Sequence, residues 1–387
     1  MIYIIIFIYL FLCSIHFDFI RKKSGRGTLY LFSWLILVLL AALRYKVGGD
    51  TYSYMNEFKY LPDLSNLFSY QSIKFKREPG WLLINAIAKA FSDDFVALQV
   101  ILAIIVNSTF FWFLKKYTKY NFTAVLVYYT FFYCYVNFEI LRESLALCVF
   151  MFSFESLKNK RYKRYYCYAL VAVFFHISAI ILFLFPLLYN RAKTINRKVF
   201  IYPIIIFVIG LLLNQLVPGI FQEITFSSIL SQKIKAYNSY SFSIFGILSS
   251  LLYYIVTPLF FINVLKKQKS LIWILPMLVI YTIIGASSTL YTIFFRFLNY
   301  IIPFYILILT EYFLYIYHKG KNYNVNYRTV IFSFMFVFFV FNNRYLRAYK
   351  EDPSIRWYSH WYPYTSVFNK VDNPAREKIY IKGWDYE

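Results

Sequence analysis

The chain has 387 residues, of which 60% are hydrophobic and only 15% are charged. A soluble domain carries roughly 25% charged residues, so this composition excludes most water-soluble proteins and indicates a membrane protein with several spans. The 41 Lys and Arg residues against 18 Asp and Glu give a formal net charge of +23. In a membrane protein such an excess reports topology, because basic residues accumulate in cytoplasmic loops, and it does not indicate a nucleic-acid partner.

Apolar runs of about 20 residues are long enough to cross a bilayer as helices. The sequence therefore predicts an all-α, polytopic membrane bundle with about ten full spans. These spans occupy residues 2–20, 28–43, 96–114, 122–137, 139–157, 199–214, 245–265, 271–291, 294–317 and 328–342. Two further apolar segments do not fit this pattern. Residues 79–91 reach only about 20 Å at about 1.5 Å per residue, and residues 166–189 form either one span or two short helices broken at residues 175–178.

The charge pattern decides between these options. Six short loops contain Lys and Arg but neither Asp nor Glu: residues 21–27, 115–121, 158–165, 190–198, 266–270 and 318–328. The positive-inside rule places all six in the cytoplasm, which requires that residues 79–91 do not cross and that residues 166–189 leave and re-enter on one side. We therefore expect both segments to be broken or re-entrant helices. Such backbone is tolerated at membrane depth only where protein buries it or where it lines a polar cavity, so both should border the functional site.

This topology predicts a single membrane domain, residues 1–342, with both chain termini outside the cytoplasm. The C-terminal tail, residues 343–387, is then extracytoplasmic. The four cysteines lie inside apolar segments, without a C-x-x-C pair and without a histidine at ligand spacing. The sequence therefore predicts neither a metal site nor a cofactor.

Ionisable side chains at membrane depth are costly and mark functional sites by default. On the predicted outer side they occur on several separate segments, together with aromatic residues: Arg44, Asp50, Tyr54, Glu78, Trp81, Arg142, Glu143, His176 and Arg296. Each has a structural explanation of its own. An arginine near a helix end extends to the interface, Glu78 precedes a helix start with Pro79 at its first position, and a lone histidine is often a buried, satisfied side chain. Independent anchoring does not favour their joint position on one side, so we interpret them as one site.

Clustered guanidinium groups bind phosphate oxygens in a forked geometry, and an outward-facing anion site between spans suits a lipid-linked diphosphate. A carboxylate or imidazole beside it can act as a general base on a hydroxyl group. Together they describe glycan transfer from a polyprenyl diphosphate to a sugar hydroxyl, in which arginines stabilise the leaving group and Asp50, Glu78 or His176 activates the acceptor. The arginines supply the positive charge that a metal ion gives other glycosyl transfers, so no metal ion is required.

The same residues resemble the EpsG family, the Wzy-like polymerases of bacterial exopolysaccharide, capsule and O-antigen clusters. The resemblance covers residues 40–300. It rests on Arg44, on G-x-D at residues 48–50 with Tyr54, on E-P-G-W at residues 78–81, on residues 137–146, on F-H-x-S-A at residues 175–179, and on Arg296 with Phe297. The chain departs from the family at one position, because Glu143 stands where the family has Gln after the arginine.

This resemblance implies a metal-independent glycosyltransferase of glycosyltransferase-C-like architecture in the bacterial cytoplasmic membrane. It would polymerise undecaprenyl-diphosphate-linked oligosaccharide repeat units on the outer face. The implied diphosphate ligands are Arg44, Arg142 and Arg296, the implied base or acceptor-positioning candidates are Asp50, Glu78 and His176, and the remaining substrate-binding candidates are Tyr54, Trp81 and Glu143. The two aromatic rings suit stacking on sugars, and an aromatic belt at the interface explains them equally well. Membrane lipids, a flippase and a chain-length regulator are the implied partners.

Three alternatives use the same residues differently. A lipid-linked oligosaccharide ligase would apply the same chemistry to another acceptor. A flippase or transporter of lipid-linked oligosaccharides would also place charge in a central cavity, but it predicts internal repeats and charges throughout the depth of the bundle, and the sequence has neither. An acyltransferase acting on cell-surface glycan would employ His176 and leave the three arginines without a common role.

Overall fold

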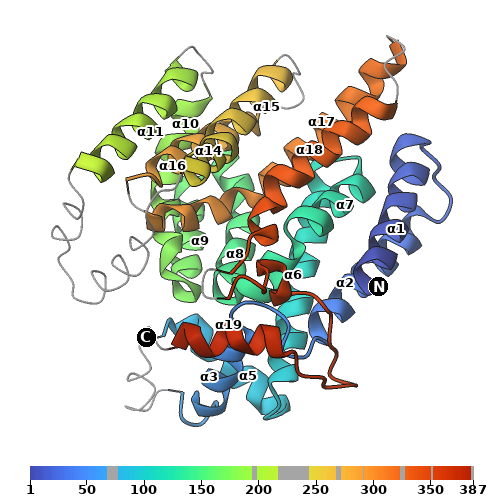
Figure 1. Cartoon of the computed structure of the whole chain (residues 1–387), viewed down its shortest axis with the longest axis vertical. Coiled ribbons are helices and arrows are strands. Elements are labelled where there is room, and N and C mark those ends of the chain that lie inside the picture. Colours follow the sequence, from blue (N-terminus) through green and yellow to red (C-terminus); the bar gives the residue numbers. More distant parts are fainter. Residues whose placement is uncertain are drawn as a thin grey trace. The chain divides into compact units, whose positions relative to one another are not determined.

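The computed structural model describes residues 1–67, 77–193, 198–216, 244–266, 272–290, 292–322, 327–349 and 352–384. Within these ranges the chain forms helices, turns and loops and contains no β-strand (Figure 1), which confirms the all-α prediction. Parts of three basic loops used in the sequence analysis, 190–198, 266–270 and 318–328, lie outside the described ranges.

The chain divides into two compact units, and each is considered by itself. The first consists of Met1–Phe154, Arg164–Ala179 and Ile331–Glu387, and the second consists of Glu155–Lys163 and Ile180–Val330. The predicted division into residues 1–342 and a tail stays a prediction.

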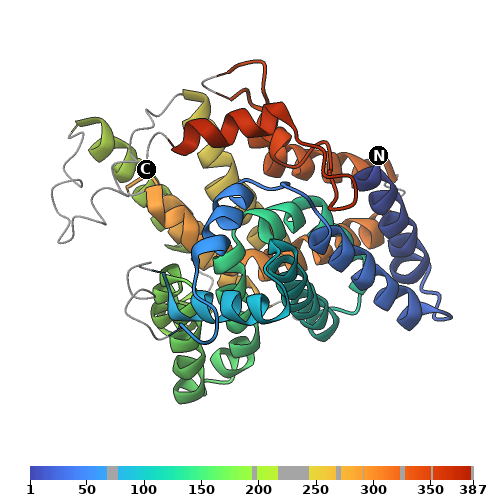
Figure 2. The same ribbon diagram turned by 90° about the horizontal axis from the view of Figure 1, so that it is seen from below.

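The first unit contains most of the predicted site. Its elements, some of which extend past its boundaries, are α1 (Ile2–Ser14), the π-helix η1 (Ile15–Phe19), α2 (Arg26–Ala42), α3 (Thr51–Tyr60), α5 (Pro79–Phe91), α6 (Phe95–Tyr117), α7 (Asn121–Phe131), the π-helix η2 (Tyr135–Glu139), α8 (Leu141–Lys158), α9 (Tyr162–Phe175), the 3₁₀ helix η3 (Ile177–Leu184), α18 (Tyr327–Leu346), the 3₁₀ helix η7 (Trp357–His360) and α19 (Pro374–Trp384). Helix α1 packs against α7, and both α2 and α5 pack against α6. Figures 1 and 2 both show α19 beside α3 and the turn that precedes it.

The second unit is built around one buried helix. Its elements are α10 (Phe185–Ala192), α11 (Lys198–Leu216), α14 (Ile244–Leu251), the π-helix η4 (Leu252–Val256), α15 (Thr257–Leu265), α16 (Leu275–Ser287), the 3₁₀ helix η6 (Thr292–Ile301) and α17 (Ile302–Asn322). Helix α16 contacts α10, α11, α15, η6 and α17. Almost all of its residues are buried, which explains why its sequence is apolar on every side.

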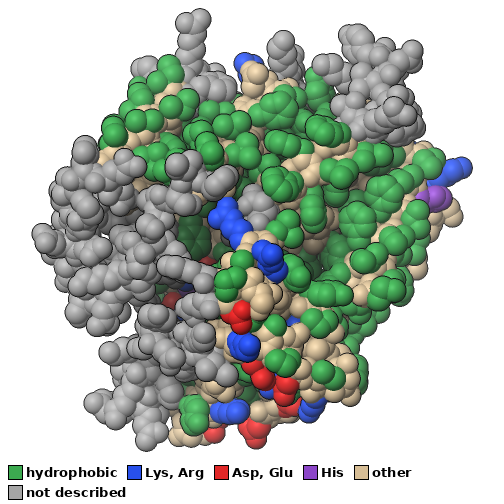
Figure 3. Space-filling model, in the orientation of Figure 1, with side chains coloured by type: hydrophobic (Ala, Val, Ile, Leu, Met, Phe, Trp, Pro, Cys, Tyr) green, Lys and Arg blue, Asp and Glu red, His purple; other side chains and the backbone are tan. Residues whose placement is uncertain are grey.

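Four helices among the described residues are long and apolar enough to cross a membrane: Ile2–Phe19, Phe95–Tyr117, Gly246–Leu265 and Phe294–His318. They coincide with four of the predicted spans. Helices also occupy the other predicted spans, but they are not among these four. The number of crossings and the glycosyltransferase-C-like arrangement therefore stay predictions. Figure 3 shows hydrophobic side chains over much of the visible surface, as expected for helices that contact lipid.

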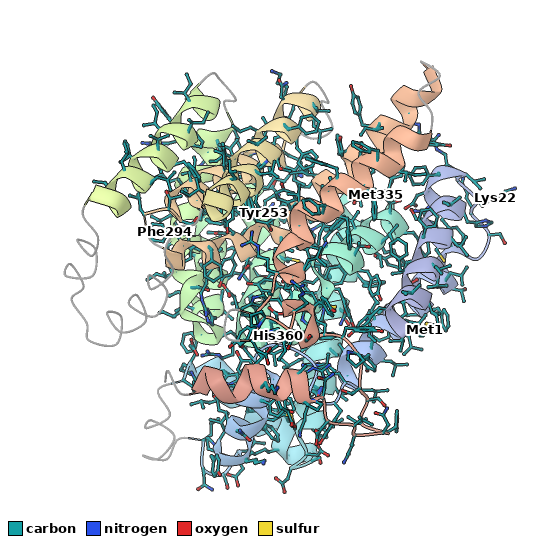
Figure 4. The ribbon with its side chains drawn as sticks, in the orientation of Figure 1. Met1, Lys22, Tyr253, Phe294, Met335 and His360 are labelled. Atoms are coloured by element: carbon teal, nitrogen blue, oxygen red, sulfur yellow. The ribbon has the colours of Figure 1, made fainter. Side chains whose placement is uncertain are left out.

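The two basic loops that follow the first helix and α6 meet in the first unit. Arg26 donates from Nη2 to the carbonyl oxygen of Lys119 over 2.7 Å and to Oδ1 of Asp18 over 2.8 Å. The second carboxylate oxygen of Asp18 accepts from the backbone N of Thr123 at 2.7 Å, in the first turn of α7. Both loops therefore lie at the end of the unit marked by Lys22 in Figure 4, as the charge pattern predicts.

The two segments predicted to be irregular are short or broken helices. Helix α5 begins at Pro79 and ends at Phe91, so it has only 13 residues. Helix α9 ends at Phe175 and the 3₁₀ helix η3 follows from Ile177, which breaks the second segment at His176. The short helix and the break are confirmed, whereas re-entry into the membrane stays a prediction.

Candidate functional site

A buried apolar cluster positions the candidate residues of the first unit. Side chains of α3, α5, α6, α8 and the adjoining turns form it: Tyr54, Phe58, Leu61, Trp81, Leu82, Ala88, Phe95, Leu98, Leu102, Leu141 and Leu145. Phe175, the last residue of α9, packs against this cluster. Because Arg142 and His176 directly follow Leu141 and Phe175, burial of these apolar neighbours fixes where the two polar side chains leave the backbone.

Glu78 joins three segments of the chain. It precedes α5 in an extended backbone conformation, and Pro79 occupies the first turn of the helix, where a missing N–H costs nothing. Its Oε2 accepts from Nη1 of Arg142 at 2.7 Å, and its Oε1 accepts from the backbone N of Ile177 at 3.3 Å. The side chains of Glu78 and Arg142 are only 16% and 17% exposed, so their charge-assisted hydrogen bond is shielded from bulk water.

This ion pair sets the charge state around α5. Burial raises the pKa of Glu78, but the Arg142 charge, the backbone and the nearby His176 together outweigh burial and hold that pKa below its ordinary 4.5. Tyr54 accepts a weak hydrogen bond from Nε of Arg142 at 3.4 Å, and burial raises the pKa of Tyr54 to about 12. At neutral pH the group therefore contains an anionic Glu78 and a neutral Tyr54.

The start of α5 closely approaches the end of α9, and Gly80 makes this possible. A Cβ atom at Gly80 would lie 2.8 Å from the carbonyl oxygen of Phe174 and 2.9 Å from Cδ1 of Phe175. These distances leave no space for a side chain. The glycine of the E-P-G-W pattern thus lets the helix start that carries Glu78 meet the break that carries His176.

His176 is held at that break through its backbone and its ring. Its N–H donates to Ala172 at 3.1 Å, and its carbonyl oxygen accepts from the N–H of Ala179 at 3.0 Å. Its Nδ1 lies 2.7 Å from Oγ of Ser178, which donates to Oε1 of Glu143 at 2.7 Å. Glu143, predicted as a substrate-binding residue, therefore reaches His176 through the hydroxyl group of Ser178.

Tyr54 and Trp81, predicted as stacking faces for sugars, lie inside the apolar cluster. Their ring centroids are 5.2 Å apart, and the residues are 7% and 1% exposed. The indole Nε1 of Trp81 donates to Glu57 at 3.2 Å, and Glu57 accepts two further bonds of 2.9 Å from Arg77. Both rings are core side chains, Tyr54 near the start of α3 and Trp81 near the start of α5. Their sugar-stacking role stays a prediction.

Arg44 turns back onto the end of α2 and is 1% exposed. Its guanidinium group donates to the carbonyl oxygen of Ala41 and, from Nε over 3.1 Å, to that of Val47. It lies 5.0 Å from the ring centroid of Phe138. The bond to Ala41 satisfies a carbonyl group that the end of α2 leaves open, and the bond to Val47 fixes the turn toward α3. A diphosphate-binding role for Arg44 stays a prediction.

The turn before α3 depends on Gly48, whose φ of +119° is a backbone conformation that other residues rarely adopt. A Cβ at this position would lie 2.7 Å from Oγ1 of Thr51 and from Cβ of Phe138. Asp50 follows on the surface, and its carbonyl oxygen accepts from the N–H of Tyr54 at 3.0 Å. Charged side chains gather at this end of the first unit, over α3, α5 and α19 (Figure 3).

The C-terminal tail docks on the same turn. Arg376 of α19 is 1% exposed and donates to the carbonyl oxygens of Lys46 at 2.8 Å, Ser359 at 3.1 Å and Pro363 at 2.6 Å. The Nζ of Lys46 pairs with a carboxylate oxygen of Asp372 at 2.6 Å. The tail therefore lies on the same side of the first unit as the turn that carries the predicted Asp50.

His360, labelled in Figure 4, connects the tail to the glycine turn. Its carbonyl oxygen accepts from the N–H of Gly48 at 2.9 Å, and its ring stacks on Trp357 with 5.2 Å between centroids. Burial, reinforced by the charge of Arg376, lowers the pKa of His360 to about 4. The imidazole is therefore neutral at neutral pH.

Arg296 lies in η6 and is partly buried. It belongs to the second unit, whereas Glu78, Arg142 and His176 belong to the first. Its participation in a common site stays a prediction.

Sequence reasoning did not assign roles to Ser178 or Arg376. Ser178 stands two residues after His176 in the F-H-x-S-A pattern, and that spacing was a usable signal for a contact with the ring. Arg376 offered none, because its partners are mostly backbone carbonyl groups, as far as 330 positions away.

Comparison with known proteins identifies the family of the chain. The model of the EpsG family matches residues 27–366, which include every predicted site residue from Arg44 to Arg296. No curated protein and no solved structure matches the chain. The chain therefore belongs to the EpsG family, as a membrane protein of polysaccharide biosynthesis with a glycosyltransferase-like, polymerase-type character.

Proposed function

We propose that the protein transfers undecaprenyl-diphosphate-linked oligosaccharide repeat units to a growing exopolysaccharide, capsule or O-antigen chain on the outer face of the cytoplasmic membrane. One observation carries the proposal. The starts of α5 and α8 and the break after α9 meet through Glu78, which contacts both Arg142 and the N–H of Ile177. A cationic group, carboxylates and an imidazole thus converge at the irregular segments of a chain of the EpsG family.

Arg142 is the proposed ligand of the diphosphate. Its Nη1 and Nε donate to Glu78 and Tyr54, and among the described residues Nη2 has no hydrogen-bond partner. A guanidinium group held through two of its three nitrogens presents its remaining donor in a fixed direction, which suits a phosphate oxygen. The buried apolar side chains around it exclude water and strengthen such a contact as charge develops on the leaving diphosphate.

The other predicted residues take supporting parts in this proposal. Arg296, predicted as a diphosphate ligand from the sequence, keeps that role in the proposal. Arg44 acts by holding the turn that leads to Asp50, as its bonds to Ala41 and Val47 suggest. Asp50, Glu78 and His176 are the groups considered for acceptor activation, without a metal ion.

The test uses the purified protein in proteoliposomes and, as donor, the lipid-linked repeat unit isolated from cells that lack the protein. Wild-type protein should convert this donor into a ladder of glycan lengths. Arg142→Ala and Arg296→Ala should each slow elongation by about 10²–10³-fold, the usual cost of losing one donor to a transition-state anion. Arg164→Ala, which removes an exposed arginine of α9, is the matched control and should leave the ladder intact.

Wild-type ladders from both arginine variants would overturn the diphosphate site. Transfer of single units to a different acceptor, without a ladder, would identify a ligase instead. Movement of the intact donor across the bilayer without transfer would identify a flippase.

A further inference from the structure

Ser178 connects two side chains of the candidate site. Its Oγ lies 2.7 Å from Nδ1 of His176 and 2.7 Å from Oε1 of Glu143. His176 and Ser178 are each 6% exposed and Glu143 is 2% exposed. Buried polar groups are retained where they are hydrogen-bonded to one another, and three of them in a row form a path along which a proton can move.

The hydroxyl group of Ser178 donates to Oε1 of Glu143. Its only hydrogen is thereby used, so its oxygen accepts from Nδ1–H of His176 in the tautomer that carries this hydrogen. The backbone N–H of Ser178 also points at Nδ1 over 3.2 Å, and it donates once Nδ1 has given up its proton. Nδ1 therefore has a partner in Ser178 both when it carries a proton and when it does not.

We propose that His176, Ser178 and Glu143 form a proton relay in which Nε2 of His176 deprotonates the acceptor hydroxyl; this inference rests on the proposed polymerase function. The acceptor oxygen forms a bond to the anomeric carbon of the donor as its proton moves to Nε2. The anomeric carbon–oxygen bond to the diphosphate breaks, and the electron pair leaves with the undecaprenyl diphosphate.

The proton on Nδ1 then passes to Oγ of Ser178, and the hydroxyl proton of Ser178 passes to Oε1 of Glu143. The products are a neutral His176 protonated at Nε2 and a protonated Glu143. The relay resets when Glu143 returns its proton through the same two bonds and Nε2 releases one to water. Every proton and electron pair is accounted for without another reactant.

The other candidates for the base are less suited to this step. Glu78 is held as an anion by Arg142 and by the N–H of Ile177, which makes it a weak proton acceptor. Asp50 lies exposed at the start of α3. Among the described residues, the charged and titratable side chains joined by hydrogen bonds around this break include Glu78 from α5, Arg142 and Glu143 from α8 and Tyr54 from α3. Ser178 links Glu143 to the ring of His176 through its hydroxyl group.

Three variants separate a relay from a purely structural contact. Ser178→Ala cuts the row, Ser178→Thr keeps the hydroxyl group, and Glu143→Gln keeps the shape but removes the charge. The first readout is the pH dependence of kcat and KM for elongation of the lipid-linked repeat unit. We expect Ser178→Ala and Glu143→Gln to lower kcat with little change in KM and to displace the pH profile, and Ser178→Thr to restore the wild-type profile.

The second readout does not require activity. Exchange of the imidazole Cε1 hydrogen for deuterium, measured by mass spectrometry for each histidine-containing peptide, gives a pH midpoint for His176, with His16 as internal reference. Loss of the Glu143 charge in Glu143→Gln should move the His176 midpoint downward by about one pH unit. Ser178→Ala should move it in the same direction, because the hydroxyl group that accepts from Nδ1–H is lost, and Ser178→Thr should leave it unchanged.

Wild-type midpoints and pH profiles in Ser178→Ala and Glu143→Gln would overturn the relay and leave the polymerase proposal intact. Failure of the wild-type protein to elongate the donor would contradict the polymerase proposal, whereas the shift of the His176 midpoint would still report the coupling. If Ser178→Ala does not fold, the comparison of Glu143→Gln with Ser178→Thr still tests the relay.

Discussion

Nη1 of Arg142 and Oε2 of Glu78 lie 2.7 Å apart and join the start of α8 to a residue 64 positions earlier. Breaking a buried ion pair costs about 3–5 kcal/mol, and the partial exposure of these side chains should roughly halve that loss. We expect Arg142→Ala and Glu78→Gln each to lower the midpoint of thermal unfolding in detergent. The double variant should lose less than the sum of the two, and strictly additive losses would contradict the coupling.

The same pair predicts how stability responds to acid. The pKa of Glu78 lies below 4.5 in the folded protein because Arg142 outweighs burial, so the unfolded chain takes up its proton first as the pH falls. The stabilisation is complete above about pH 4.5 and is lost as the pH falls through the lower folded pKa. The difference in unfolding midpoint between wild type and Glu78→Gln should be constant from pH 7 to 5 and shrink below 4.5. A difference that persists to pH 3 would contradict this assignment.

Gly80→Ala tests the close approach of α5 to α9. The added Cβ would lie 2.8 Å from the carbonyl oxygen of Phe174, and overpacking of this kind costs about 1–3 kcal/mol. Gly27→Ala is the matched control, because a Cβ there meets no atom within 4 Å. We expect Gly80→Ala to lower both the unfolding midpoint and the rate of glycan elongation, and Gly27→Ala to change neither. Equal behaviour of the two variants would show that the packing is not required.

The tail should detach from the first unit in mild acid. The pKa of His360 is lowered to about 4 by burial and by Arg376, whereas an unfolded histidine titrates near 6.5. The detached tail therefore binds a proton that the docked tail does not, and docking weakens as the pH falls from 6.5 to 4. Limited proteolysis of the tail should accelerate over this interval in the wild type. His360→Gln should remove the acceleration, and an unchanged pH dependence in that variant would assign it to another group.

Cysteine labelling tests the predicted sidedness. In a protein whose four native cysteines are replaced, a membrane-impermeant maleimide should label Asp63→Cys and Phe368→Cys in intact cells. Phe368 is 82% exposed in the tail, and the tail contacts the turn between α2 and α3. Lys116→Cys should react only after the membrane is permeabilised. The reverse pattern would overturn the orientation, and labelling of Asp63→Cys without Phe368→Cys would contradict the docking of the tail.

Local signals predicted the irregular helices correctly. Pro79 after an acidic residue marks the start of α5, and the length of the apolar run sets its end at Phe91. The polar His176 and Ser178 within an apolar segment coincide with the break after α9. The start of α5 and the break after α9 depend on a few neighbouring residues. Both can therefore be predicted from one sequence without knowledge of distant contacts.

Contacts between distant segments were not predictable in the same way. An arginine after a helix end can extend into the interface or turn back onto open carbonyl groups, and the sequence around Arg44 is compatible with both. The bond from Ser178 to Glu143 depends on how α8 packs against the end of α9. The folded tail depends on bonds from Arg376 to backbone carbonyl groups, which carry no sequence signal.

The contact between tail and turn also concerns the order in which the protein is made. Tyr3 donates from its hydroxyl group to the carbonyl oxygen of Trp361 at 2.9 Å, and the N–H of Tyr45 donates to the carbonyl oxygen of Thr365 at 2.8 Å. Lys46 lies in the turn and binds Arg376 of the tail. The ribosome adds Arg376 to the chain 330 residues after Lys46. The turn that leads to Asp50 therefore acquires its final contacts only after nearly the whole chain has been synthesised and inserted, so a truncated chain cannot complete this part of the protein.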